Sequence, residues 1–188
     1  MTITKFLLLL ILLDLSVCTG CKDKEWTTLP PETQTGANTF GCMIDNELFI
    51  GGYFAPWMQT ALSASYNVIS DKLYIGAYGK INEQAAGSIS MEIDTPRENF
   101  TQNLSLASYM PSSYHPTTSS TGTICINFET INDGKCTITK LDTIQKIVSG
   151  QFEFIGKCTF NYNDSTVTKQ LMQGRFDLKF DIINNIDE

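Results

Sequence analysis

The stretch Phe176-Asp177-Leu178-Lys179-Phe180-Asp181-Ile182 alternates apolar and polar side chains without a break. In an extended strand, successive side chains point to opposite faces, so this segment has one apolar face and one polar face. Such alternation is typical of an antiparallel strand that buries one face and leaves the other in water. The stretch therefore predicts a β-strand whose apolar side chains lie in a core and whose Asp177 lies on a solvated face.

The same period of two residues recurs toward the N-terminal end of the chain. Phe40, Cys42 and Ile44 alternate with other residues, and a short Asp45-Asn46 segment separates them from a second run, in which Leu48 and Ile50 alternate. Two short β-like runs joined by two turn residues predict a hairpin.

Further short alternating runs fill the region between these two segments. We expect strands over residues 66–69, 72–78, 88–93, 103–108, 123–131 and 149–154, and a long loop over the Pro-, Ser- and Thr-rich residues 109–122. No stretch has a sustained helical period. The sequence therefore predicts an all-β single domain, an antiparallel β-sandwich or meander, with a closed barrel as the less favoured alternative.

The first 20 residues differ from the rest of the chain. Lys5 is followed by the unbroken apolar run Phe6–Leu13, which is too short to span a bilayer as a helix. A short basic start, a brief apolar core and then small residues are typical of a secretory signal peptide. We therefore assign residues 1–20 to a signal peptide, and expect export.

Cys21 follows the small residues Thr19 and Gly20 directly. This arrangement resembles the lipobox of bacterial lipoproteins, in which a cysteine receives lipid on its sulfur. The resemblance implies cleavage before Cys21 and a lipid anchor, including an acyl group such as palmitate, on Cys21. One acyl chain alone holds a protein only marginally on a membrane, and the lipoprotein modification supplies more than one. The alternative is an ordinary secretory signal with Cys21 in a disulfide.

The segment after Cys21 lacks any period. It contains Pro30, Pro31 and Gly36 among Thr, Gln and Asn residues. Tandem prolines favour an extended, solvated backbone. We expect residues 21–38 to form a lipid-anchored flexible tether, with the β domain over residues 39–188.

Four segments together carry a family resemblance: Leu29-Pro30-Pro31-Glu32-Thr33-Gln34-Thr35-Gly36-Ala37-Asn38-Thr39-Phe40-Gly41-Cys42, residues 137–142, residues 149–154 and residues 174–180. They resemble an uncharacterised family of Bacteroidota lipoproteins, known only as a domain of unknown function. The resemblance implies a cell-envelope protein anchored in the outer membrane, facing the periplasm or the cell surface. It implies no activity.

The charge balance limits the classes of partner that we expect for this chain. The chain of 188 residues has 13 Lys and Arg against 20 Asp and Glu, with a net charge of −7. Nucleic-acid backbones are bound through clustered basic residues, so we expect no nucleic-acid partner. The expected partners are the membrane, through lipid on Cys21, and a possible glycan or protein.

Beyond Cys21, the domain contains Cys42, Cys125, Cys136 and Cys158. They form no Cys-x-x-Cys pair, so we expect no metal site and no cofactor. A predicted hairpin turn at residues 132–134 sets two of them out of register by roughly 16 Å, which disfavours a Cys125–Cys136 disulfide. The other pairings, and buried free thiols, stay open; the alternation places Cys42, Cys136 and Cys158 inward.

The sequence contains no nucleophile and base in a recognisable arrangement, and its one histidine, His115, lies in the expected long loop. We therefore assign no catalytic residue. Paired carboxylates could hydrolyse glycosides, and the candidates, all on polar strand positions, are Glu92, Asp94, Glu129, Glu153 and Asp177. We favour solvated strand faces over catalysis for all of them.

The aromatic stretch around Tyr53, Phe54 and Trp57 is the main candidate for ligand binding. Aromatic side chains beside Pro and Gly can form a stacking platform for a glycan or a peptide. The alternative, which we favour, is that Phe54 and Trp57 close one end of the sandwich. We therefore favour a non-enzymatic structural or accessory lipoprotein, with a surface ligand-binding module second and a carboxylate hydrolase third.

Overall fold

The computed structural model describes residues 27–52, 60–81, 85–113, 125–129, 134–160 and 166–184, and these contain strands and no helix. The strands are β1 (Thr39–Ile44), β2 (Glu47–Gly51), β3 (Leu62–Asn67), β4 (Lys72–Lys80), β5 (Ala85–Asp94), β6 (Phe100–Asn103), β7 (Leu106–Ser113), β8 (Cys125–Glu129), β9 (Lys135–Asp142), β10 (Ile147–Phe160), β11 (Thr166–Lys179) and β12 (Asp181–Ile183).

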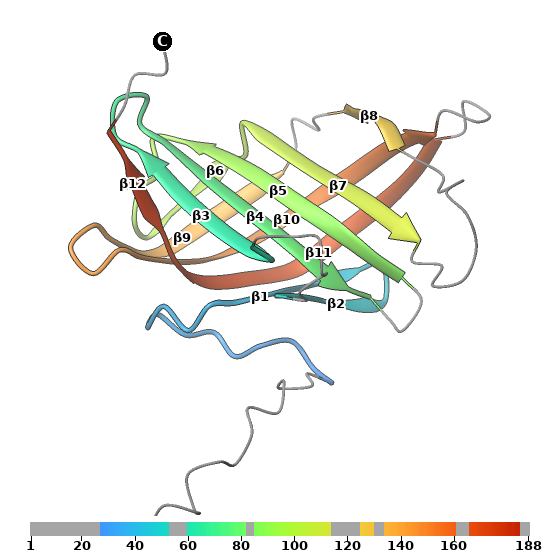
Figure 1. Cartoon of the computed structure of the whole chain (residues 1–188), viewed down its shortest axis with the longest axis horizontal. Coiled ribbons are helices and arrows are strands. Elements are labelled where there is room, and N and C mark those ends of the chain that lie inside the picture. The colour runs from blue at the N-terminus through green and yellow to red at the C-terminus, as the bar shows by residue number, and fades with distance from the viewer. Residues whose placement is uncertain are drawn as a thin grey trace, which may run out of the picture.

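All of these strands belong to one sheet. Its order is β12-β3-β4-β2-β1-β11-β10-β9-β6; in addition, β5 pairs with β4 and β7, and β8 pairs with β10. The sheet curls so that β3, β4, β5 and β7 lie across from β9, β10 and β11, with β1 and β2 at the bend between the two halves (Figure 1). Only the β12–β3 pair is parallel among the strand pairs described. The prediction of an all-β, largely antiparallel single domain is confirmed, and one curled sheet provides both layers.

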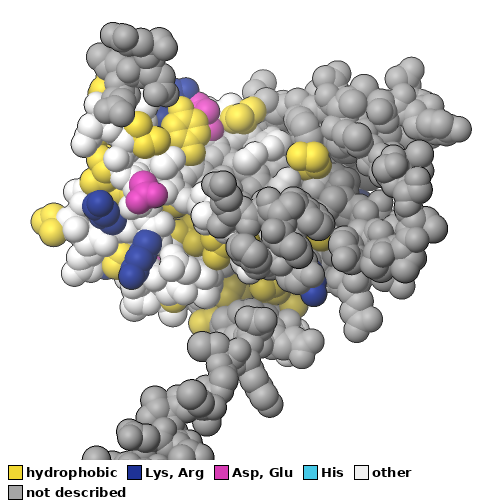
Figure 2. Space-filling model, in the orientation of Figure 1, with side chains coloured by type: hydrophobic (Ala, Val, Ile, Leu, Met, Phe, Trp, Pro, Cys, Tyr) yellow, Lys and Arg dark blue, Asp and Glu magenta, His cyan; other side chains and the backbone are white. Residues whose placement is uncertain are grey.

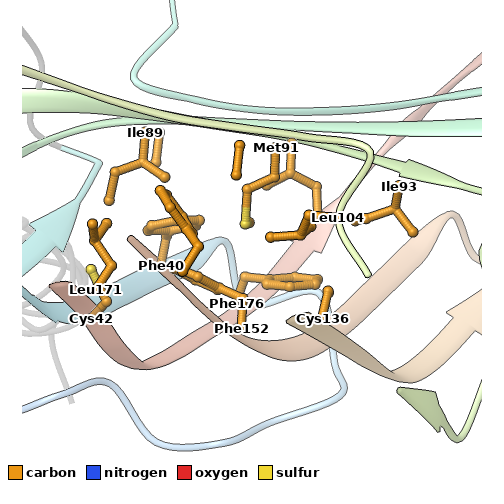
Figure 3. Packing of buried hydrophobic residues seen from close by; sticks show 14 of the residues in the cluster. Phe40, Cys42, Ile89, Met91, Ile93, Leu104, Cys136, Phe152, Leu171 and Phe176 are labelled. Carbon is orange, nitrogen blue, oxygen red and sulfur yellow. The ribbon is translucent and has the colours of Figure 1, made fainter. Parts of the chain in front are cut away.

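The core lies between the two halves of the sheet. Ile89 and Met91 of β5 face the aromatic side chains of the opposite half, among them Phe40, Phe152 and Phe176 (Figure 3). The alternating stretch in β11 buries Phe176 and Leu178, as predicted. The outer face turned toward the viewer in Figure 2 mixes hydrophobic, basic and acidic side chains with other polar groups, as expected for a solvated sheet face.

Two phenylalanines of the core lie over glycines on the neighbouring strand. In the β10–β11 register, Phe152 is opposite Gly174 and Gly150 is opposite Phe176. A Cβ atom on Gly174 would lie 2.6 Å from the Phe152 ring, and one on Gly150 would lie 2.7 Å from Cζ of Phe176. The two glycines therefore provide the space in which these rings fit.

The predicted N-terminal hairpin is confirmed, and its register decides which residues of β2 are buried. Asp45 adopts the left-handed φ of 54° that a tight two-residue turn requires. Cys42 pairs with Phe49, so both face the core, and Phe49 is fully buried while Leu48 and Ile50 are only half-buried.

The predicted pairing of the strands on either side of residues 132–134 is wrong, and residues 130–133 lie outside the described residues. β8 and β9 do not pair with each other, because both pair antiparallel with the long strand β10: β9 along Ile147–Glu153 and β8 along Lys157–Phe160. A strand of 14 residues has room for two shorter partners in succession on one edge. The predicted long loop is also partly wrong, since its first residues, 109–113, belong to β7.

Cys42 and Cys136 are buried and free, as the alternation predicted for their inward orientation. The register that argued against a Cys125–Cys136 disulfide does not exist, but a free Cys136 agrees with the conclusion. The side chains of Cys125 and Cys158 lie outside the described residues. Burial raises the pKa of Cys136 to about 12 and also raises that of Cys42.

We expect Cys42 and Cys136 to resist thiol reagents in the native protein, because a reagent needs both access and a thiolate. Peptide mass spectrometry after iodoacetamide treatment at pH 8 should find both unmodified without denaturant and both modified in 6 M guanidinium. Rapid native modification of either would contradict their burial.

Candidate functional site

Asp177 of β11 is 1% exposed, although it lies on the outer face of the sheet. The prediction of a solvated Asp177 is therefore wrong. The cause is residues 30–38, here called the strap, which precede β1 and run beneath the sheet in Figure 1. The strap covers Asp177 and its cross-strand neighbour Ser149, which is also buried.

Both carboxylate oxygens of Asp177 accept several hydrogen bonds. Oδ1 accepts from the Gly36 N–H at 2.8 Å and from the Ser149 hydroxyl at 2.8 Å. The remaining donors, all to Oδ2, are Thr33 Oγ1 at 2.6 Å, Thr35 N at 3.0 Å, Thr35 Oγ1 at 3.3 Å and Ala37 N at 3.1 Å. Successive backbone N–H groups in this arrangement form an anion-binding nest, and Gly36 supplies the positive φ, 70°, that such a turn favours.

These hydrogen bonds decide the ionisation of Asp177. Burial alone would raise the pKa of the carboxyl, but the bonds from Thr33, Ala37, Ser149 and Thr35 outweigh burial and hold the pKa at about 2. Asp177 is therefore charged at neutral pH, and its charge fixes the strap to the sheet.

Other contacts hold the two ends of the strap. Pro30 is buried against Gly41, where a Cβ atom would lie 2.7 Å from Pro30 Cδ. Arg175 Nη1 donates to the Pro30 carbonyl at 3.1 Å, and the Lys179 N–H donates to Asn38 Oδ1 at 3.0 Å. Residues 30–38 thus form part of the folded domain, which corrects the expectation of a flexible tether over all of residues 21–38.

A polar trough of about 380 Å³ lies beside the strap on the same outer face. One row of cross-strand neighbours crosses it: Thr101 of β6, Thr137 of β9, Gln151 of β10 and Arg175 of β11. The other polar side chains that line the trough are Glu32, Lys135, Glu153 and Gln173.

Arg175 is held in place but incompletely paired. Its Nη1 is bound to the Pro30 carbonyl, while Nη2 lies 3.6 Å from Oε1 of Glu32, whose side chain is 55% exposed. Nε is buried and has no hydrogen-bond partner among the described residues. Sequence analysis missed this residue, although its position two residues before Asp177 places both on one face.

The carboxylates proposed for catalysis do not form one group. Glu92 and Asp94 both lie on β5 and form ion pairs with Lys72, the second at 3.2 Å. Glu153 lines the trough in the other half of the sheet, and Asp177 is enclosed by the strap. The side chain of Glu129 lies outside the described residues.

Several other predicted residues also fall outside the described ranges, namely Cys21, Tyr53, Phe54, Trp57 and His115. The two ends that flank the aromatic stretch are described: Gly52 and Ala61 line a second hollow of about 470 Å³, together with Leu62 and Phe180.

Searches for similar proteins among family models, curated proteins and solved structures found no match. The resemblance to the lipoprotein family therefore stays a prediction. In the part of the chain that the structure describes, no helix is both long and apolar enough to cross a membrane. Over the same residues, no three His, Cys, Asp or Glu side chains are grouped to hold a metal ion.

Proposed function

We propose that this chain is a non-enzymatic cell-envelope lipoprotein, held on the outer membrane by lipid on Cys21, with a structural or accessory role. The observation that supports this role best is the attachment of the strap to Asp177. It makes the segment that follows the proposed anchor a fixed part of the β domain.

The strap leaves few residues between the proposed anchor and the β domain. From Cys21 to the buried Pro30 is about nine residues, which span at most about 30 Å even when fully extended. A load applied at Cys21 would pass through the strap to β11, in the middle of the sheet, through the five hydrogen bonds from the strap that end on Asp177. This attachment suits a module that must stay folded close to a membrane.

The surroundings of the candidate carboxylates favour this role over hydrolysis. Glu92 and Asp94 bind the same lysine, Lys72, and Asp177 is saturated with donors from the strap. A glycosidase needs two carboxyl groups on either side of one substrate bond, roughly 5–9 Å apart. Asp177 has no free oxygen for such a task.

The anchor is tested by metabolic labelling with a clickable palmitate analogue. We expect label on the wild-type chain, loss to background in Cys21→Ser, and unchanged label in Cys18→Ser, the matched control. Label that persists in Cys21→Ser would refute Cys21 as the lipid site, and no label in the wild type would refute the lipid anchor and leave a secreted domain. Protease treatment of intact cells then distinguishes the two faces, because only a surface-exposed domain is degraded.

A further inference from the structure

The row Thr101, Thr137, Gln151 and Arg175 spans four adjacent strands on the outer face. Directly opposed side chains on neighbouring strands are about 5 Å apart, so the row is about 15 Å long. Thr101 and Thr137 already share a hydrogen bond of 2.7 Å between their hydroxyls. The trough is therefore built on four paired strands, with Arg175 at the end next to the strap.

The Nε–Nη2 side of the Arg175 guanidinium lacks a close hydrogen-bond partner. Nε and Nη2 form one planar edge of a guanidinium, the edge that binds a carboxylate through two parallel hydrogen bonds. Here Nη2 has only Glu32 at 3.6 Å, beyond ordinary hydrogen-bond length, and Nε has no partner among the described residues. A charged donor left buried and unsatisfied is destabilising, so a carboxylate on this edge is favoured.

We propose that this trough binds an acidic saccharide, with the carboxylate of a uronic acid on the Nε–Nη2 edge of Arg175 in place of the exposed Glu32 side chain. The inference rests on the non-enzymatic role proposed above, but not on the lipid anchor. The volume of about 380 Å³ lies within the range of small-ligand sites.

The lining of the trough favours a saccharide over a peptide. Each sugar hydroxyl both donates and accepts, and so do the hydroxyls of Thr101 and Thr137 and the amides of Gln151 and Gln173. Two common modes of peptide recognition are main-chain hydrogen bonds at a sheet edge and pockets for the peptide side chains. The trough lies on a sheet face, and its one aromatic lining residue, Phe152, is buried in the core.

The test is calorimetric titration of the purified Cys21→Ser chain, which carries no lipid, with trigalacturonate, galactotriose and a tri-glutamate peptide. We expect trigalacturonate to bind at least tenfold more tightly than the other two. Arg175→Lys should weaken it at least tenfold, because lysine keeps the charge but not the paired edge. Arg97→Lys, an exposed arginine away from the trough, should leave binding unchanged.

Arg175 also holds the strap, so a second variant separates binding from folding. Gln151→Ala is exposed and should weaken trigalacturonate binding several-fold while the thermal unfolding midpoint stays within 2 °C. Equal binding of galactotriose would refute carboxylate recognition, and tighter binding of the peptide would refute the saccharide. Absence of binding by all three probes would overturn the proposal while leaving the Cys21 labelling result untouched.

Discussion

Asp177→Asn is expected to lower the free energy of unfolding by about 3 kcal/mol at pH 7. Asparagine keeps one acceptor oxygen and places an NH₂ group where the carboxylate accepts the N–H groups of Thr35 and Ala37 or of Gly36. Donor then faces donor in a buried site, and the strap must detach or leave polar groups unpaired. Urea unfolding monitored by tryptophan fluorescence or circular dichroism measures the loss.

The same carboxylate sets an acid limit on stability. Its pKa is lowered from 3.8 to about 2 in the folded protein, so the native state holds this proton less tightly than the unfolded state does. The resulting stabilisation, about 2 kcal/mol, is complete above about pH 5 and is lost as the pH falls toward 2. The difference in stability between wild type and Asp177→Asn should therefore shrink over this range.

Asp181→Asn is the matched control, because Asp181 is exposed at the start of β12 only four residues further along the chain. We expect Asp181→Asn to change the free energy of unfolding by less than about 0.5 kcal/mol, both at pH 7 and at the acid end of this range. Equal effects of the two substitutions would show that the strap does not depend on Asp177. Limited proteolysis gives a second measure, since a detached strap should be cut near residues 33–37 in Asp177→Asn alone.

Alternation in the sequence was sufficient to predict the strand class and much of the core. Phe176 and Leu178 are buried as their period indicates, and the two-residue turn at Asp45-Asn46 forms the predicted hairpin. These features are local, because the direction of a side chain along a strand depends only on its position in that strand.

The pairing of β8 and β9 could not be deduced in this way. The segment Asn132-Asp133-Gly134 has turn composition, which indicates that the chain changes direction there but not which strand follows beside which. The length of β10 decides the outcome, since it pairs with both strands along one edge. That information lies in a partner distant in sequence.

The candidate site was hidden for a related reason. The period correctly placed Asp177 on the outer side of its strand, but it cannot show whether another segment covers that face. The polar strap residues favour solvent when considered alone, and only their fit around one carboxylate makes them part of the fold. A glycine within the run Thr33-Gln34-Thr35-Gly36 was the available signal for an anion-binding turn.

Phe152→Ala is expected to cost about 3–5 kcal/mol, the largest effect of any single substitution considered, because it opens a cavity in the core. Phe152 is 3% exposed, and its ring lies 5.1 Å from that of Phe40, 6.0 Å from that of Phe154 and 6.4 Å from that of Phe176, between centroids. Guanidinium unfolding measures the loss. Phe100→Ala, at a residue 52% exposed on β6, is the control and should cost below about 1 kcal/mol.

A substitution at Gly174, which lies beneath the Phe152 ring, distinguishes a specific fit of the ring from a simple loss of buried apolar area. Gly174→Ala alone should be destabilising, because its Cβ would lie 2.6 Å from the Phe152 ring. In the Phe152→Ala background that ring is gone, so the added methyl group meets a cavity and its cost should fall by more than about 1 kcal/mol. Strictly additive effects in this double-mutant cycle would contradict the fit of Phe152 over Gly174. A cost that falls in this way would mean that the Phe152 ring depends specifically on the space that Gly174 leaves beneath it.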